Sequence, residues 1–374
     1  MSLGIAGMGW VTPLGSDITG VWERLLQGNA GTAQSISSPL GPDYPVIPVP
    51  AEAIARAPAH PRLRRSSAIS RFAVIAGLAA LEDAGLKLDA EAAARTALIF
   101  AVSNGGVIYT KRFYHDIVAS GAQAASPLLF PETVFNAPAS HLAAILGITG
   151  TSYTLVGDGA VGILALKMAE DLLASETLDR CLVVGAEEAD WLLCDAYRKW
   201  RLLRSMPPIE PFQDPPRGTI LSEGAGALLL KRDGMIRLEK IAAGTNFHRQ
   251  REAGEAMRKI FEELGDDQVD LVMASANGTF IDAAEHGAIS RSCPAAKVYA
   301  MKEALGESVG AGSLWQTICG AQCLRTQLVP ANAAPGFGPE AQSQPSQRSD
   351  QLQRVVVSVC GLNQQVAGLR LTKS

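Results

Sequence analysis

A glycine-rich corner between Gly157 and Gly162 is the stretch whose residue types and spacing point most directly to chemistry. The segment YTLVGDGAVG contains the end of an apolar run, and the residues from Gly162 onward, GILALKMAEDLLAS, have the apolar spacing of a helix. Glycine permits positive φ and close backbone approach, and the free amides of a helix's first turn carry a partial positive charge. Such a strand-to-helix corner suits a phosphate group or a nucleophilic side chain.

Two interpretations of this corner differ in what it would hold. Gly157, Gly159 and Gly162 match the GxGxxG pattern of dinucleotide-binding folds. Glu187 and Glu188 end the next apolar run, where such folds place a ribose-binding acid. The alternative is a nucleophile turn without its nucleophile, because no Ser, Cys or Thr lies between Gly157 and Gly162. Both interpretations stay open on these residues alone.

The composition is that of a globular protein with a large core. With 374 residues, of which 47% are hydrophobic, the chain is long enough for two domains or two packed halves. A net charge of -4 and scattered Lys and Arg argue against nucleic-acid and membrane-surface partners. We find no signal peptide and no apolar run near the roughly 18 residues that a membrane span needs. We therefore expect a cytoplasmic location.

The six cysteines are typical of buried free thiols. None forms a CxxC motif, and the one close pair, Cys319 and Cys323, has no histidine nearby to complete a zinc set. Free cysteine behaves as a small hydrophobic side chain in a core. We therefore expect no bound metal.

Apolar strands alternate with helices in two successive series, which is the pattern of layered α/β proteins. The second series begins after a charged turn near residue 232, so we predict an N-terminal half at 1–232 and a C-terminal half at 233–374. A small basic cluster, Arg62, Arg64 and Arg65, precedes one helix of the first half. It is either a solvated loop or a docking point for an acidic partner.

Five stretches, taken in order, give the chain a family resemblance. They are GMGWVTPLGSDITGVWERLLQGNAG, FPETVFNAPASHLAAILGITGTSYTLVGDGAVG, PFQDPPRGTILSEGAGALLL, ANGTFIDAAE and MKEALGESVGAGS. Together they resemble the β-ketoacyl-acyl-carrier-protein synthases of the thiolase-like fold. The resemblance implies an α/β fold in which two similar halves pack as αβαβα layers. Because the family also has a GAE-like strand end after its nucleophile helix, it accounts for the glycines and glutamates without a cofactor.

The family's reaction implies particular side chains in the site. A cysteine at a helix N-terminus takes the acyl group, two histidines stabilise the thioester oxygen and the enolate, and a lysine organises the site. Here the cysteine position falls on Gly159, the first histidine on Asn277 and the second on Glu307. Of the four positions only Lys302 is retained.

The residues around these positions carry further expectations. Asp158 is the nearest reactive group, and we expect it to be an N-cap or first-turn acid of the helix that follows, where the dipole favours an acid. Lys302 and Glu307 are expected to pair with each other. The family's aromatic gate near the C-terminus falls on Cys360 and Leu362, which we therefore expect to line a substrate pocket.

These substitutions predict a ketosynthase-like subunit that does not catalyse the condensation reaction. Such a subunit resembles a chain-length factor of fatty-acid, polyketide or polyene assembly. The expected partners are an acyl carrier protein and a competent ketosynthase, with a homodimer as the alternative to that heterodimer. An acyl-thioester enzyme with changed chemistry, using Asp158, Asn277, Lys302 and Glu307, is the second hypothesis. An NAD(P)-binding oxidoreductase is the third, and five ordered motifs weigh against it.

Overall fold

The computed structural model describes residues 3–266, 268–335, 347–348 and 352–374. Its main sheet has, in the described residues, the strand order β13-β11-β10-β15-β16-β9-β1-β8-β6-β4-β5. The strands of the first half are β1 (Leu3–Val11), β4 (Thr96–Val102), β5 (Ser152–Val156), β6 (Arg180–Glu187) and β8 (Gly224–Lys231). Those of the second are β9 (Ile236–Asn246), β10 (Leu271–Met273), β11 (Lys297–Tyr299), β13 (Ala334–Pro335), β15 (Arg354–Cys360) and β16 (Gln365–Lys373).

The two halves of this sheet repeat one pairing scheme. In the first half β1 and β8 are antiparallel, β8 and β6 are antiparallel, and β6, β4 and β5 are parallel. In the second, β9, β16, β15, β10 and β11 follow the same sequence of antiparallel and parallel pairs. The halves meet where β1 pairs with β9 at Leu3 and Gly4. Two similar α/β halves are therefore confirmed, and the boundary between residues 232 and 233 stays a prediction.

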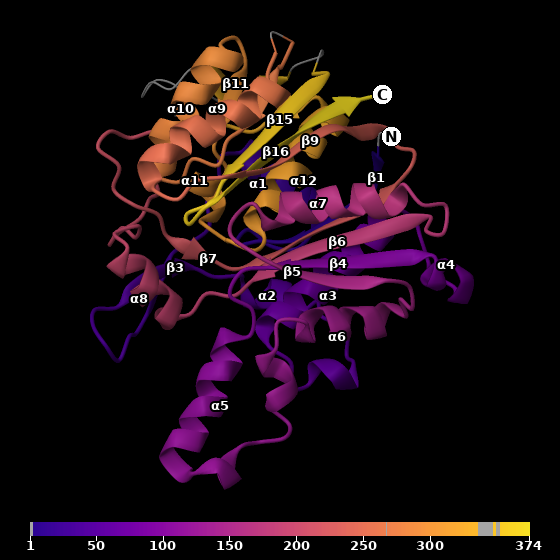
Figure 1. Ribbon diagram of the computed structural model, residues 1–374, viewed down its shortest axis with the longest axis vertical. Helices are drawn as coiled ribbons and strands as arrows, with labels where there is room; N and C mark the ends of the chain where they lie inside the picture. The colour runs from indigo at the N-terminus through magenta and orange to yellow at the C-terminus, as the bar shows by residue number, and fades with distance from the viewer. Residues whose placement is uncertain (1–2, 267, 336–346, 349–351) are drawn as a thin grey trace.

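Helices cover both faces of the folded sheet and fill the space between its halves (Figure 1). α3 (Ala68–Asp83) and α6 (Ala137–Leu146) pack on the first half, and α9 (Ala253–Leu264) and α10 (Phe280–Ser292) form the outer layer of the second. Between the halves lie α7 (Val161–Leu173) and α12 (Gly312–Thr326), which contact strands of both. Residues 312–324 of α12 are all buried, as expected of a helix enclosed on every side. These are the predicted αβαβα layers.

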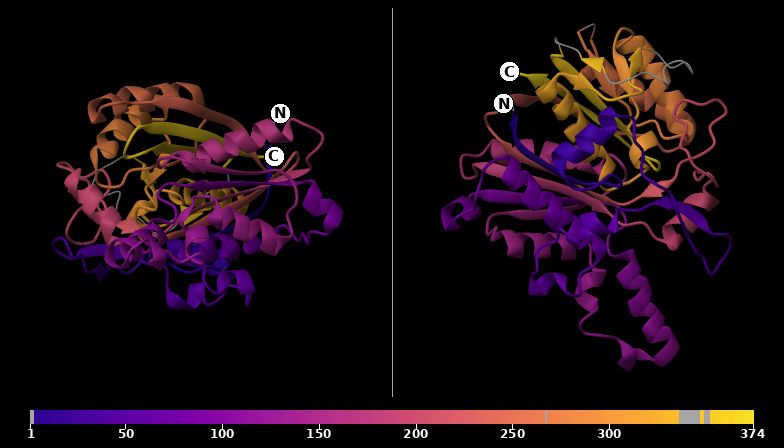
Figure 2. Two further views of the ribbon diagram at one scale, coloured as in Figure 1. Left: turned by 60° about the horizontal axis from the view of Figure 1, so that its bottom comes forward. Right: turned by 180° about the vertical axis from the view of Figure 1, so that it is seen from behind.

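The remaining elements lie around this frame. One of them, α5 (Val107–Ser120), has no buried residue and projects with the segment after it from the body of the molecule (Figures 1 and 2). The others are α1 (Ile18–Leu26), β2 (Gln34–Ile36), β3 (Tyr44–Ile47), α2 (Ala51–Ile54), α4 (Ala90–Ala94), α8 (Trp191–Lys199), β7 (Leu221–Ser222), α11 (Lys302–Leu305), β12 (Leu328–Val329) and β14 (Gln347–Arg348), with 3-10 helices at Pro61–Leu63, Ala122–Ala124, Phe130–Thr133 and Gln250–Glu252.

All six cysteines are buried and none is in a disulfide, which confirms the prediction of free thiols. In the part of the chain that the structure describes, no three His, Cys, Asp or Glu side chains gather as a metal site would require. No helix among the described residues is both long enough and apolar enough to span a bilayer.

Candidate functional site

The glycine corner lies between the end of β5 and the start of α7, against the C-terminal half. A Cβ on Gly157 would lie 2.9 Å from the side-chain oxygen of Gln365, and a Cβ on Gly162 would collide with Ser313 Oγ. A Cβ on Gly159, by contrast, would have Gly361 Cα as its nearest neighbour, at 3.4 Å. Gly162 is therefore needed for close packing between the halves, a Cβ at residue 157 would displace the end of the Gln365 side chain, and position 159 has room for a side chain.

The dinucleotide interpretation finds no support in this geometry. Glu187 is only 3% exposed, and its Oε2 accepts hydrogen bonds from the amides of Ser103 and Asn104, both at 3.2 Å. Burial raises the pKa of this carboxyl to about 7. Its role is to hold the loop after β4, so it is not available to a ribose.

Asp158 does not cap α7, and that prediction was wrong. The residue before α7 is Ala160, and no side chain caps this helix. Asp158 Oδ2 instead accepts hydrogen bonds from the amides of Asn363 at 2.8 Å and Gln364 at 3.0 Å. These amides belong to the turn between β15 and β16, whose proximity to the corner the local sequence did not indicate.

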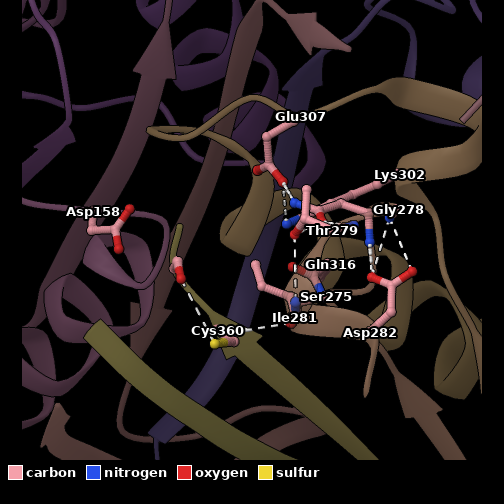
Figure 3. Close-up of polar contacts among 12 residues, drawn as sticks. Asp158, Ser275, Gly278, Thr279, Ile281, Asp282, Lys302, Glu307, Gln316 and Cys360 are labelled. Carbon is pink, nitrogen blue, oxygen red and sulfur yellow. Dashed lines mark hydrogen bonds and ion pairs between the residues drawn. The ribbon is translucent and has the colours of Figure 1, made fainter. Parts of the chain in front are cut away.

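Asn277, Lys302 and Glu307 meet in one buried cluster. Lys302 and Glu307 of this cluster are labelled in Figure 3. Glu307 Oε2 accepts a hydrogen bond from Lys302 Nζ at 2.7 Å and one from Asn277 Nδ2 at 2.5 Å. The side chains of Lys302 and Glu307 are 5% and 3% exposed. The expected pairing of lysine with glutamate is confirmed, and the asparagine amide joins it.

The backbone around this cluster is fixed by hydrogen bonds from several elements. Asn277 follows β10, and its Oδ1 accepts the Thr279 hydroxyl at 2.6 Å. Lys302 begins α11. The Glu307 amide donates to Ile220 O at 2.9 Å, and Glu307 O accepts the Ser222 amide at the same distance. These two backbone hydrogen bonds join residue 307, in the loop after α11, to the chain around the start of β7. They thereby fix the position from which the Glu307 carboxylate projects.

Two carboxyl groups that support the site were missed by the sequence analysis. Asp282 accepts the amides of Asn277 and Gly278, and burial raises its pKa to about 6. Glu285 accepts the amide and the hydroxyl of Ser275, and burial raises its pKa to about 7. Both lie on α10 three residues apart, directly after the Asn277 motif, and that spacing of two acids on one helix face was the available signal.

Cys360 is the last residue of β15 and Leu362 lies in the β15–β16 turn, and both are buried, with exposures of 1% and 7%. Cys360 lies opposite Val366 in the pairing of β15 with β16. Burial first, and then the negative charges of Glu285 and Asp158, raise the pKa of the Cys360 thiol well above its usual value. This thiol therefore stays protonated and is a poor nucleophile. That the two side chains line a substrate pocket stays a prediction.

Tyr197 on α8 is a further neighbour of the site, and nothing in its sequence context singled it out. It is buried, and its pKa is raised by burial and then by the negative charges of Asp158, Glu187 and Glu307. These acids belong to the corner, to the end of β6 and to the buried cluster, and the phenol is within electrostatic reach of all three. The structure thus gathers the predicted residues around one seam between the halves.

Two domain families match this chain in succession. The N-terminal domain of β-ketoacyl synthase matches residues 55–234, and its C-terminal domain matches residues 239–334. The chain belongs to the β-ketoacyl synthase family. This membership confirms the resemblance of the ordered motifs, and it leaves the dinucleotide interpretation without a fold to support it.

Relatives of this β-ketoacyl synthase family member are distant in sequence. It is 26% identical to nodulation protein E of Rhizobium leguminosarum bv. trifolii over 356 residues, 88% of each chain. A match to nodulation protein E of Rhizobium sp. (strain N33), also 26% identical, covers 61% of this chain and 57% of that relative. The 3-oxoacyl-[acyl-carrier-protein] synthase 2 of Coxiella burnetii is 24% identical over 87% of this chain and 86% of the relative.

Solved structures share the fold of this family member over its whole length. The ishigamide ketosynthase/chain length factor superposes with a TM-score of 0.86 at 19% identity, covering 100% of this chain and 99% of that chain. A ketosynthase in complex with its chain length factor from Xenorhabdus doucetiae gives 0.79 at 19% identity, with coverages of 100% and 98%. The thiolase-like fold is confirmed, and the loss of catalysis stays a prediction.

The Lys302–Glu307 pair predicts a specific stability defect. Glu307→Gln leaves the Lys302 charge buried without its counter-charge, so we expect the free energy of unfolding to fall by about 3–5 kcal/mol. The double variant K302M/E307L removes both charges and should lose less stability than the single variants Lys302→Met and Glu307→Leu combined. Urea unfolding at neutral pH measures these values.

An exposed ion pair provides the matched control. Lys259 and Glu255 are 3.3 Å apart with side chains 55% and 64% exposed, so Lys259→Met should cost about 1 kcal/mol or less. If the fall in unfolding free energy of the double variant equals the sum of the falls in the two single variants, Lys302 and Glu307 are not a coupled buried pair.

Glu285 predicts a pH-dependent stability. Its carboxyl has a pKa of about 7 in the folded chain against an ordinary value of 4.5. Between these values the unfolded chain binds fewer protons than the folded one, so stability falls as the pH rises through this window. Glu285→Gln imitates the protonated acid and should remove about 3 kcal/mol of that fall. Unfolding curves from about pH 5 to 8 measure the slope, and equal slopes for variant and wild type would refute the raised pKa.

Proposed function

We propose that this chain is a non-condensing, chain-length-factor-like subunit of fatty-acid, polyketide or polyene assembly, working in the cytoplasm beside a competent ketosynthase. The observation that carries the proposal is the pair of residues Gly159 and Glu307. Glycine stands at the corner where the family's nucleophilic cysteine would lie. A buried carboxylate stands where its second histidine would lie.

The chemistry of the family reaction explains why these residues support the proposal. Acyl transfer needs a thiolate that bonds to the thioester carbon, and glycine offers no such atom. The following condensation builds negative charge on an enolate, which donors stabilise and a carboxylate opposes. Glu307 Oε2 also accepts a hydrogen bond from Lys302 and one from Asn277. Those two donors are therefore already used and do not point at a substrate oxygen.

The edge strand β5 supports pairing with another protein. In the described sheet β5 pairs with β4 alone, so its other edge presents unpaired amides and carbonyls. Large apolar side chains on β5 and in the segment before α6 are exposed. The edge patch consists of Tyr153 (43% exposed) and Val156 (52%) on β5, whereas Leu128 (62%), Phe130 (57%) and Phe135 (45%) are exposed on the segment between α5 and α6.

We assign the edge patch to a competent ketosynthase. Exposed apolar groups of this size along an unpaired strand edge favour association unless a partner covers them. One structural neighbour is a ketosynthase in complex with its chain length factor, which supports a heterodimer for this chain too. A second copy of the chain is the competing occupant.

The basic cluster supports a carrier-protein partner. Arg62, Arg64 and Arg65 are exposed around the buried Leu63, ahead of α3. A compact group of cations on a chain of net charge -4 steers acidic partners to one place. A polyketide acyl-carrier protein in complex with its ketosynthase is among the structural neighbours, at 15% identity. We therefore propose that an acidic acyl carrier protein docks at this cluster.

The alternative is an acyl-thioester enzyme with changed chemistry in the same pocket. Lys302 Nζ and Asn277 Nδ2 are buried donors that could polarise a thioester carbonyl if Glu307 released them. This alternative requires product formation that depends on Lys302, whereas the subunit proposal requires none. Turnover of an acyl or malonyl carrier protein by this chain alone, lost in Lys302→Ala, would favour the alternative.

The heterodimer is tested by a charge placed on the edge patch. Val156→Lys puts a cation at the centre of the proposed interface, and we expect at least a tenfold weaker association with a coexpressed ketosynthase from the same source. Native mass spectrometry and sedimentation velocity measure the complex. Met235→Lys is the control, because Met235 is 68% exposed and lies in the β8–β9 turn. An exclusive homodimer, or a heterodimer indifferent to Val156→Lys, would count against the proposal.

Loss of the nucleophile is tested by intact-mass measurement. After incubation with an acyl carrier protein bearing a thioester, we expect no acyl adduct on the wild-type chain, because all six thiols are buried. The partner ketosynthase, assayed in parallel, should gain one acyl group and serves as the positive control. A stoichiometric adduct on this chain, mapped to any residue, would overturn the proposal.

A further inference from the structure

The turn between β15 and β16 is tied to the glycine corner by contacts that the proposed function does not use. Asp158 Oδ2 accepts the amides of Asn363 and Gln364, at 2.8 Å and 3.0 Å. The Asp158 amide in turn donates to Gln365 Oε1 at 2.9 Å. One residue of the N-terminal half therefore makes three hydrogen bonds to consecutive residues of the C-terminal half.

Gly361 makes this arrangement possible. A Cβ at residue 361 would overlap the Asp158 carboxylate, so only glycine lets the acid reach the turn amides. The turn itself is closed by the Gly361 amide, which donates to Gln365 O at 2.8 Å. The side chains of Asn363 and Gln364 are exposed, so their backbone amides are the groups through which the turn is held.

The held turn also lies directly against the corner. The nearest heavy atom to a Cβ built on Gly159 is Gly361 Cα, at 3.4 Å. Cys360 and Leu362, which flank Gly361, are both buried. Gly159 is half-buried, so movement of residues 361–364 would expose it further, and it would shift Leu362 and the adjoining end of β15 at Cys360.

We propose that Asp158 is a latch that holds the β15–β16 turn closed over Gly159. The carboxylate accepts two backbone amides, and bonds from amides to a charged acceptor are about twice as strong as neutral ones. Asp158 thereby positions Cys360 and Leu362 and restricts access to the corner. The latch does not depend on whether the chain pairs with a ketosynthase.

A thiol introduced under the turn reports on the latch. Gly159→Cys places a reactive atom where a Cβ has room, and its alkylation by iodoacetamide at mildly alkaline pH is followed by mass spectrometry of the peptide containing residue 159. Because Asp158 also raises the pKa of a neighbouring thiol, rates are measured over a pH series and compared as rate constants of the thiolate. On that scale we expect D158A/G159C to be alkylated at least tenfold faster than G159C. D158N/G159C, which keeps an acceptor oxygen without the charge, should be intermediate.

Two measurements separate a latch from general destabilisation. D171A/G159C is the matched control, because Asp171 is an exposed acid of the same helix that pairs with Lys167. Its alkylation rate should equal that of G159C. Hydrogen exchange in Asp158→Asn should rise at residues 361–366 and stay unchanged in α9 and α12. Equal alkylation rates with and without Asp158, or unchanged exchange in the turn, would overturn the proposal.

Discussion

Close approach of the two halves along α7 and α12 is the constraint on which the site depends. Where the glycine corner meets the C-terminal half, a methyl group on Gly162 would strike Ser313 and one on Gly157 would crowd Gln365. Because α12 is buried between the sheets, its side chains have no space into which they could retreat. The spacing of these glycines, which resembles a phosphate-binding loop, is therefore explained by packing between two α/β units.

Several ionisable side chains are buried along the same boundary between the halves. Lys302 and Glu307 compensate each other directly. Glu187, Asp282 and Glu285 instead accept backbone amides and hydroxyls, and burial raises their pKa values toward or into the neutral range. Buried carboxyls of this kind hold loops in place because each one satisfies several donors that would otherwise be unpaired. The loops that carry these donors are consequently fixed in place, whatever chemistry the site retains.

The parts that the sequence predicted are those specified by local or repeated patterns. Alternating strands and helices indicated the layers, and the family motif that contains both Lys302 and Glu307 indicated their pairing. Asp158 shows the limit of such reasoning. An acid before a helix predicts a cap, yet its partners lie 205 and 206 residues away. No local sequence pattern indicates which distant turn will present free backbone amides. Contacts between the two halves could therefore be identified only from the structure.

The altered positions also depend on one another, which bears on whether single substitutions could restore the family chemistry. A cysteine at residue 159 would face the Asp158 carboxylate close by, and nearby negative charge raises a thiol's pKa and disfavours the reactive thiolate. A histidine at residue 277 would lose the amide that Asn277 donates to Glu307. Replacing Glu307 would leave the Lys302 charge buried and unpaired. Each reversal thus removes a contact that now stabilises the fold, so a return to condensation would require several concerted changes.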